Sequence, residues 1–283
     1  MSPVISTSNG FSLQPKSSSS ILSFAREARP GRSPRKAKPV NFFGHAVVAS
    51  AFSTEPDFLL GSMLPDLIAM AGVDGRGLIG GDLASGVSLH HATDAVYHEH
   101  PLVKRRMAEG AAALVSSGLS RHQARGLAHV GVELVSDGIL AVERAPEVAF
   151  RPALRRARDS GVVADGLRDD EDRRRWHRLL DLILDSGLPE AYREPGFVTA
   201  RLESMTRQRP RFRLGPGQVE FLGLWVESVA ARIDPEVEQV LDDVLDRLGR
   251  VPTRRAGRGA ASESASSLPG ATSDPASKRY GRP

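Results

Sequence analysis

The sequence predicts an all-α fold, with one helical domain between two polar tails. Apolar residues recur at three- and four-residue spacing through the middle of the 283-residue chain, and alternating β-branched runs are absent. The ends differ in composition, since residues 1–39 contain ten serines and residues 251–283 include a low-complexity Ala/Ser/Glu run. Such segments lack the apolar side chains that offset the entropy of ordering. We therefore predict disordered tails at 1–39 and 251–283 and a helical domain at 40–250.

Ten helices are expected in this domain, in chain order: 41–52, 57–71, 79–99, 101–117, 120–143, 147–159, 169–186, 196–207, 217–232 and 235–249. The spacing of apolar residues predicts all ten, and four have end signals as well. Gly72, Gly118 and Gly187 follow the expected ends of the second, fourth and seventh helices, where glycine favours a C-terminal cap. Pro101 suits the first turn of the fourth helix, and Ser120 is a suitable N-cap for the fifth.

The basic balance of the chain lies in its tails. Lys and Arg number 38 against 34 Asp and Glu, which gives a net charge of +4 and a sequence pI of about 9.7. Residues 40–250 carry 25 basic and 31 acidic residues, so the domain itself is acidic. Binding to a phosphate backbone needs a basic stripe. We therefore do not expect the domain to bind nucleic acid.

Composition also excludes several classes of protein. The chain has no cysteine, which excludes a disulfide framework, a thiolate zinc site and a cysteine nucleophile. No apolar run approaches the roughly 20 residues of a membrane span, and the N-terminus lacks the apolar region of a signal peptide. We expect a soluble cytoplasmic protein. The Ser/Arg-rich start also has the composition of an organellar transit peptide, although a plain tail is favoured.

Four of the eight histidines lie in the eleven residues from 90 to 100. On a helix, His90, Asp94 and His98 are four residues apart and share one face, with His91 beside them. Imidazole and carboxylate one turn apart can share a divalent metal such as manganese, iron or zinc. The alternative is a solvated helix face on which His90 and Asp94 form an ordinary pair.

A second polar stripe lies on a more apolar helix. His129, Glu133 and Asp137 again step by four, while most residues between them are apolar. A helix that is apolar nearly all round is buried, so its ionisable groups must be paired, hydrogen-bonded or metal-bound. A buried hydrogen-bond network and an exposed stripe are the alternatives to a metal site.

Two further polar residues stand in apolar surroundings, His45 after Asn-Phe-Phe-Gly and Asp66 after Ser-Met-Leu-Pro. Taken alone, His45 is better explained as a core histidine and Asp66 as a helix cap. Together with the two stripes, they suggest polar groups that converge inside a helical bundle, where metal sites are commonly built. HD-type phosphohydrolases use the same His and Asp ligands, with metal lowering the pKa of a bound water.

The order of these motifs resembles the acyl carrier protein phosphodiesterase family. The similar segments span about residues 41–214, and their order and spacing carry the resemblance more than any single motif does. They are Asn41-Phe-Phe-Gly-His45 with Ala49, Gly61-Ser-Met-Leu-Pro-Asp66, Gly86-Val-Ser-Leu-His90 with Asp94 and His100-Pro101, Glu133 with Asp137 and Leu140, and Arg209-Pro-Arg211. Members of this family usually begin almost directly at Asn-Phe, which makes Val40 a candidate initiation site.

The resemblance implies an all-α fold distantly similar to HD-domain phosphohydrolases. It also implies an enzyme that uses a divalent metal to hydrolyse the phosphodiester between 4′-phosphopantetheine and a carrier-protein serine. Mn²⁺ is the first choice of metal, with Fe²⁺, Mg²⁺ and Zn²⁺ as alternatives. The residues that it assigns to metal binding are His45, Asp66, His90, Asp94 and Asp137. For catalysis we expect His90 and Asp94 to act with His91 or His98, either of which can carry a proton because imidazole titrates near neutral pH. His129 and Glu133 are secondary candidates.

Arginines near the end of the domain are candidates for substrate contact. Guanidinium groups match phosphate oxygens, so Arg209 and Arg211 are expected to bind phosphate or the carrier protein. A solvated arginine run around a turn at Pro210 is the alternative. An acidic carrier protein would need a local basic patch on this acidic domain, and Arg173–Arg175 and the 207–213 stretch are the two candidates.

Three positions depart from the family pattern. His91 replaces a usual Arg, His98 replaces a usual Asp, and Gly138 replaces a common His. These changes remove a phosphate contact, alter the charge of the metal site and remove a ligand or proton carrier. The function expected from the motifs and the resemblance is a metal-dependent phosphodiester hydrolase. Because of these three departures, the alternative is an inactive or diverged helical protein that binds a metal or a partner.

Overall fold

The structure is a computed structural model that describes residues 42–75, 80–145, 148–207 and 212–249. Every regular element in these residues is helical, which confirms the all-α class. The α-helices are α2 (Phe43–Ser50), α3 (Pro56–Ala71), α4 (Gly81–Glu99), α5 (Pro101–Ser116), α6 (Arg121–Arg144), α7 (Phe150–Ser160), α8 (Asp170–Ser186), α9 (Pro195–Arg207), α10 (Pro216–Ile233) and α11 (Val237–Arg247). Two 3₁₀ helices, η2 (Ala164–Gly166) and η3 (Glu190–Arg193), lie in connections.

All ten predicted helices are present. The largest difference at any end is three residues, because α7 begins at Phe150 where 147 was expected. Ser120 caps α6 through a capping box with Gln123, and Gly72 ends α3 in the left-handed conformation. The 3₁₀ helices were not predicted because elements this short have no periodic signal. The predicted tails, 1–39 and 251–283, lie outside the described residues.

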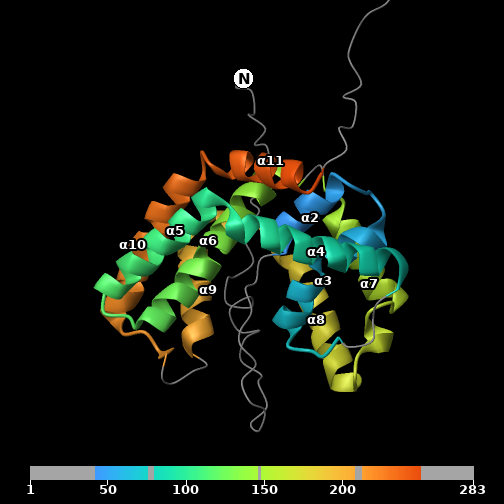
Figure 1. The fold of residues 1–283 in the computed structure, drawn as a ribbon. Coiled ribbons are helices and arrows are strands. Elements are labelled where there is room, and N and C mark those ends of the chain that lie inside the picture. The colour runs from blue at the N-terminus through green and yellow to red at the C-terminus, as the bar shows by residue number, and fades with distance from the viewer. Residues whose placement is uncertain (1–41, 76–79, 146–147, 208–211, 250–283) are drawn as a thin grey trace, which may run out of the picture. The chain divides into compact units, whose positions relative to one another are not determined.

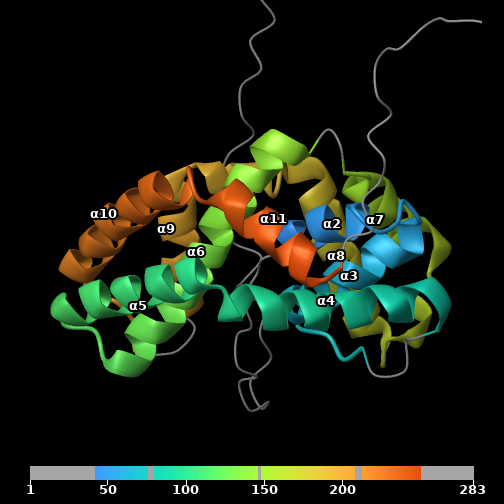
Figure 2. The same cartoon turned by 45° about the horizontal axis from the view of Figure 1, so that its top comes forward.

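Helix α6 is the centre of the packing, as its apolar sequence predicted. Its buried side chains occur on all sides from Ala124 to Ala141. It contacts α2, α5, α9, α10, α11 and η3. Figures 1 and 2 show α5, α9 and α10 beside α6, whereas α2, α3, α7 and α8 lie together in the other half of the domain. Polar residues on α6 therefore face other helices, and the arrangement of those helices decides what they meet.

Helices α3 and α4 cross in backbone contact at two glycines. A Cβ at Gly61 would lie 2.2 Å from the carbonyl oxygen of Leu83, and a Cβ at Gly86 would lie 2.2 Å from that of Phe58 and 2.8 Å from the Gly61 Cα. No side chain fits between the two backbones. This contact sets how α3 lies against α4, and so where Ser62 and Asp66 lie relative to the histidines of α4.

His100 joins α4, α5 and α11 at one point. It is buried, and its Nδ1 accepts a hydrogen bond from the Leu102 N–H at the start of α5 (3.3 Å). The opposite ring nitrogen, Nε2, therefore carries the proton that it donates to Asp243 Oδ2 on α11 at 3.1 Å. Figure 2 shows the result, with α11 lying over α4 near its junction with α5.

None of the helices in the described ranges combines the length and the apolar composition needed to cross a membrane.

The glycine contact between α3 and α4 can be tested by adding one methyl group. We expect Gly86→Ala to lower the free energy of unfolding by about 3 kcal/mol or more, because the new Cβ meets backbone atoms that cannot move alone. Gly126→Ala is the matched control, since nothing lies within 4 Å of a Cβ at this helical position. It should stabilise α6 by about 0.5–1 kcal/mol. Urea unfolding measures both, and equal effects would contradict the close crossing.

Candidate metal centre

Four helices bring the polar residues of the two stripes together. The predicted stripe on α4 faces the predicted stripe on α6, because His98 Nε2 lies 3.5 Å from Glu133 Oε1. Helix α2 adds His45 and α3 adds Asp66. The side chains that meet here are His45, Asp66, His90, Asp94, His98, His129 and Glu133.

His45, His90 and Asp94 form the first group with ligand atoms close enough to hold one metal ion. His45 Nε2 lies 3.2 Å from Asp94 Oδ1, and His90 Nε2 lies 3.5 Å from Asp94 Oδ2. Two ligand atoms about 2.1 Å from a shared tetrahedral ion lie about 3.4 Å apart. The two histidines are buried and Asp94 is 40% exposed, so the group is open to solvent on the side of this carboxylate.

A backbone carbonyl orients His90. Its Nδ1 lies 2.9 Å from the carbonyl oxygen of Ser62, which can only accept, so Nδ1 carries the proton and Nε2 carries the lone pair. Burial and the charge of His45 lower the pKa of His90 to about 3. A neutral imidazole with a fixed tautomer and an outward lone pair is what a metal ligand requires, and a carbonyl partner is the usual means of fixing it.

The pKa of His45 is shifted in the opposite direction to that of His90. Burial lowers its pKa, but the hydrogen bond with Asp94 and the charges of Asp66, Asp94 and Asp137 outweigh burial and raise it. For Asp94, burial raises the pKa, whereas the same hydrogen bond and the charges of His45, His90 and His98 lower it to about 2. The carboxylates around His45 thus favour a positive charge at this position, which is also what a bound divalent ion would supply.

Asp66 lies at the edge of the first group. Its Oδ2 is 3.6 Å from His45 Nε2 and has no hydrogen-bond partner among the described residues. Burial, followed by the charges of neighbouring carboxylates, raises its pKa well above the ordinary value despite the opposing effect of His45. The alternative weighed for Asp66 taken alone, a helix cap, does not hold, because Asp66 lies inside α3. A buried carboxyl facing the group is available as a further ligand.

His98, His129 and Glu133 form a second group with ligand atoms in reach of one ion. Glu133 Oε1 lies 3.5 Å from His98 Nε2 and 2.8 Å from His129 Nε2. Burial and the charges of Asp94 and Asp137 raise the pKa of Glu133 well above the ordinary value. Burial also lowers the pKa of both histidines, which favours their neutral forms.

Asp137, predicted as a metal ligand, has other partners. Its carboxylate accepts hydrogen bonds from the backbone N–H groups of Phe42, Phe43 and Gly44 at 2.9, 3.0 and 2.8 Å. It therefore caps the N-terminus of α2, which has no cap from its own segment. Burial raises the pKa of Asp137 to about 6 against the lowering effect of these bonds. Its clearest role is to hold α2, and with it His45, against α6.

Close packing of the η3 backbone against α6 explains the glycine at position 138. A Cβ at this position would lie 2.3 Å from the carbonyl carbon of Tyr192 and 2.5 Å from the backbone N of Arg193. The η3 backbone therefore occupies the space that a histidine would need. Glycine at this position allows η3 to pack on α6. It also means that residue 138 offers no side-chain ligand to the candidate centre.

The remaining predicted residues lie away from these groups or outside the described residues. His91 is exposed on α4, with its ring 5.2 Å from that of His90. Arg209 and Arg211 lie outside the described residues. Arg207, at the end of α9, donates two hydrogen bonds to Glu203 of the same helix. The structure therefore places neither His91 nor Arg207 in the centre.

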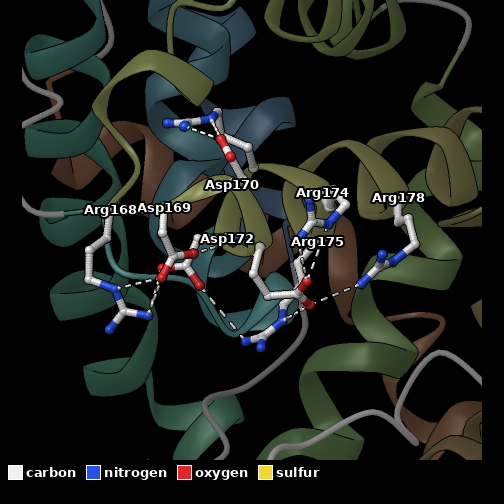
Figure 3. Close-up of polar contacts among 9 residues, drawn as sticks. Arg168, Asp169, Asp170, Asp172, Arg174, Arg175 and Arg178 are labelled. Carbon is white, nitrogen blue, oxygen red and sulfur yellow. Dashed lines mark hydrogen bonds and ion pairs between the residues drawn. The ribbon is translucent and has the colours of Figure 1, made fainter.

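The Arg173–Arg175 run was expected as a basic docking patch, and its charge is balanced locally. Figure 3 shows arginines and acids of α8 paired along the helix. Arg173 Nε lies 3.1 Å from Asp170, and Arg174 and Arg175 both donate to Glu171, at 3.0 and 3.2 Å. The acids come from the preceding turn, which is the ordinary i,i+3 and i,i+4 arrangement. The run is a charge-paired helix face.

A small cavity adjoins the centre. Its volume is about 70 Å³, and His45, Asp94, Glu133 and Asp137 line one side. The other sides are mainly apolar side chains of α5, α6, α10 and α11: Leu102, Val103, Leu140, Ile233, Val237, Val240, Leu241 and Val244. The centre therefore has a polar wall next to an apolar space.

Sequence reasoning missed Ser62 and Tyr97. Ser62 acts through its backbone carbonyl, which has no signal in the sequence. Tyr97 lies on α4 beside the centre, and its hydroxyl is 3.3 Å from Ser136 Oγ on α6. Its place among the clustered histidines was the available signal.

Comparisons with protein-family models, curated proteins and solved structures found no match for this chain. Function is therefore inferred from the chemistry of the centre and from the motif resemblance.

The capping role of Asp137 predicts a loss of stability that does not depend on metal. In Asp137→Asn, one amide oxygen replaces two carboxylate oxygens, and the amide NH₂ faces backbone N–H donors. We expect the free energy of unfolding measured in EDTA to fall by about 2–3 kcal/mol. Asp185→Asn, on the exposed side of α8, should change it by less than about 0.5 kcal/mol. A loss seen only with added metal would identify Asp137 as a ligand instead.

Proposed function

We propose that the protein is a metal-dependent phosphodiester hydrolase, with a holo-acyl carrier protein as its candidate substrate. The observation that carries the proposal is the convergence of His45, His90 and Asp94 from two helices, with the His90 tautomer fixed by Ser62. His45, His90 and Asp94 would hold the ion, and Asp66 is within reach as a fourth ligand. Mn²⁺ suits this mixed nitrogen and oxygen set, as do Fe²⁺ and Zn²⁺.

The chemistry supplied by a bound divalent ion is polarisation of a phosphoryl oxygen and a lowered pKa for bound water. The remaining work falls to side chains of the centre. His98 lies 4.0 Å from Asp94 Oδ1 and is 31% exposed, so it can exchange a proton with solvent. Because burial lowers its pKa, it is neutral near pH 7 and able to accept a proton.

The substrate class rests on the resemblance and on the shape of the site. The first group is open to solvent at Asp94, and a cavity of about 70 Å³ with mainly apolar walls adjoins it. The paired arginines of α8 supply little free positive charge for an acidic carrier protein. Of the described arginines in the other candidate stretch, Arg207 is paired with Glu203, and the exposed Arg213 is the candidate contact for such a partner.

One observation favours the second candidate, a metal-binding helical protein without turnover. Arg106 is the one lysine or arginine among the described residues that line the cavity, and it donates to Glu236 Oε2 at 2.9 Å. Phosphoryl transfer usually employs a cation to stabilise the charge of the transition state. If the metal does not supply this stabilisation alone, the centre binds metal without hydrolysis.

The proposal predicts metal-dependent release of phosphopantetheine. The purified chain should act on a holo-carrier protein, or on bis(p-nitrophenyl) phosphate, with Mn²⁺ and not with EDTA. Asp94→Asn should reduce the rate by more than about a hundredfold, because this carboxylate contacts both histidines of the first group.

Asp82→Asn is the matched control on the same helix, exposed in the first turn of α4, and should leave the rate unchanged. Absence of hydrolysis with Mn²⁺, Mg²⁺, Fe²⁺ and Zn²⁺ alike would reject the enzyme in favour of the metal-binding alternative. Elemental analysis and the effect of EDTA on the melting temperature would then establish the metal.

A further inference from the structure

His98, His129 and Glu133 lie beside the first group and share none of its three residues. We propose that these three side chains bind a second divalent cation, and that Asp94 joins the two ions. This inference rests on the proposed function only for the presence of an ion in the first group. The class of ligand is a borderline divalent metal such as Zn²⁺, Mn²⁺ or Fe²⁺, since the donors are two imidazoles and a carboxylate.

The donor atoms converge from two helices. His129 and Glu133 are one turn apart on α6, and His98 approaches from α4. The Nε2 atoms of both histidines lie within 3.5 Å of the same Glu133 oxygen. The two rings are also close, with centroids 4.8 Å apart. A compact set of two nitrogens and an oxygen with exposed edges is the arrangement of an open three-ligand site.

The burial of Glu133 is the second, independent observation. Its side chain is 1% exposed, and Oε2 has no hydrogen-bond partner among the described residues. His129 Nε2 is likewise buried and without a hydrogen bond, although it lies 2.8 Å from Glu133 Oε1. A buried carboxylate is costly unless it is paired or binds a metal. Glu133 Oε2 and His129 Nε2 are therefore buried polar atoms without a hydrogen bond, and a shared metal ion would provide each residue with a partner.

Asp94 lies between the two groups. Its Oδ1 is 3.2 Å from His45 Nε2 in the first group and 4.0 Å from His98 Nε2 in the second. Its Oδ2 faces His90. A carboxylate so placed can contact two ions, and two-metal hydrolytic sites hold their ions about 3.5–4 Å apart. The second site thereby gives His98 a metal-binding role in place of proton transfer.

Metal stoichiometry tests the second site without requiring activity. The full chain is stripped with EDTA, titrated with Mn²⁺ or Zn²⁺ by calorimetry, and analysed for metal content after dialysis. We expect two ions per chain, and a spin-coupled electron paramagnetic resonance spectrum with Mn²⁺. His129→Gln and Glu133→Gln should each leave one ion and a mononuclear spectrum. His122→Gln, at an exposed position near the start of α6, should retain two.

The outcomes separate the second site from the proposed function. One ion per chain at saturating metal, unchanged in His129→Gln and Glu133→Gln, overturns the second site even if hydrolysis is observed. Two ions without hydrolysis support the second site and reject the enzyme. If Glu133→Gln unfolds, His98→Gln is the substitute, since this side chain is partly exposed. A proton carrier at 98 would leave the stoichiometry at two, whereas a ligand would reduce it to one.

Discussion

The backbone contact between Gly61 and Gly86 is the constraint on which the candidate metal centre depends. Because no side chain separates the two helices, the carbonyl of Ser62, one residue after Gly61, reaches His90, four residues after Gly86. That hydrogen bond fixes which ring nitrogen of His90 faces Asp94. A wider crossing would leave the same residues on α4, but it would neither fix the tautomer nor bring Asp66 Oδ2 within 4.0 Å of His90 Nδ1. The close packing of the two glycines therefore sets the orientation of the His90 ring.

Charge balance is the second constraint, and Asp137 and Glu133 meet it in different ways. Both acids lie on the buried side of α6. Three backbone N–H groups at the start of α2 receive the carboxylate of Asp137, so its charge is offset by the helix end. Glu133 has two imidazoles for neighbours and an oxygen without a hydrogen bond. Equal spacing on one helix therefore gives one structural carboxylate and one that is available to a cation.

Much of the fold was predictable because amphipathic helices have a periodic spacing of apolar residues that is visible in the sequence. The ten helices and the two polar stripes follow from local spacing. The stripes also face each other, as expected if polar groups in apolar surroundings converge inside a bundle. What could not be predicted depends on residues distant in the chain. The role of Asp137 is set by amides 93–95 residues earlier, and the space at Gly138 is filled by η3. The Arg173–Arg175 run shows a different failure, since the neutralising acids were adjacent in the sequence and helix spacing alone would have paired them.

The departures at 98 and 138 have different physical effects on the centre. At 138, the backbone of η3 excludes any side chain, so a ligand lost there cannot be restored by mutation without moving that segment. At 98, an imidazole stands where the resembling family usually has a carboxylate, within 3.5 Å of Glu133 and 4.0 Å of Asp94. This exchange removes one negative charge from a cluster that already contains several buried acids. It also replaces an oxygen donor with a nitrogen donor, and imidazole suits Zn²⁺ and Fe²⁺ better than Mg²⁺. The partly exposed donors of the candidate centre, Asp94, His98 and His129, therefore lie on α4 and α6.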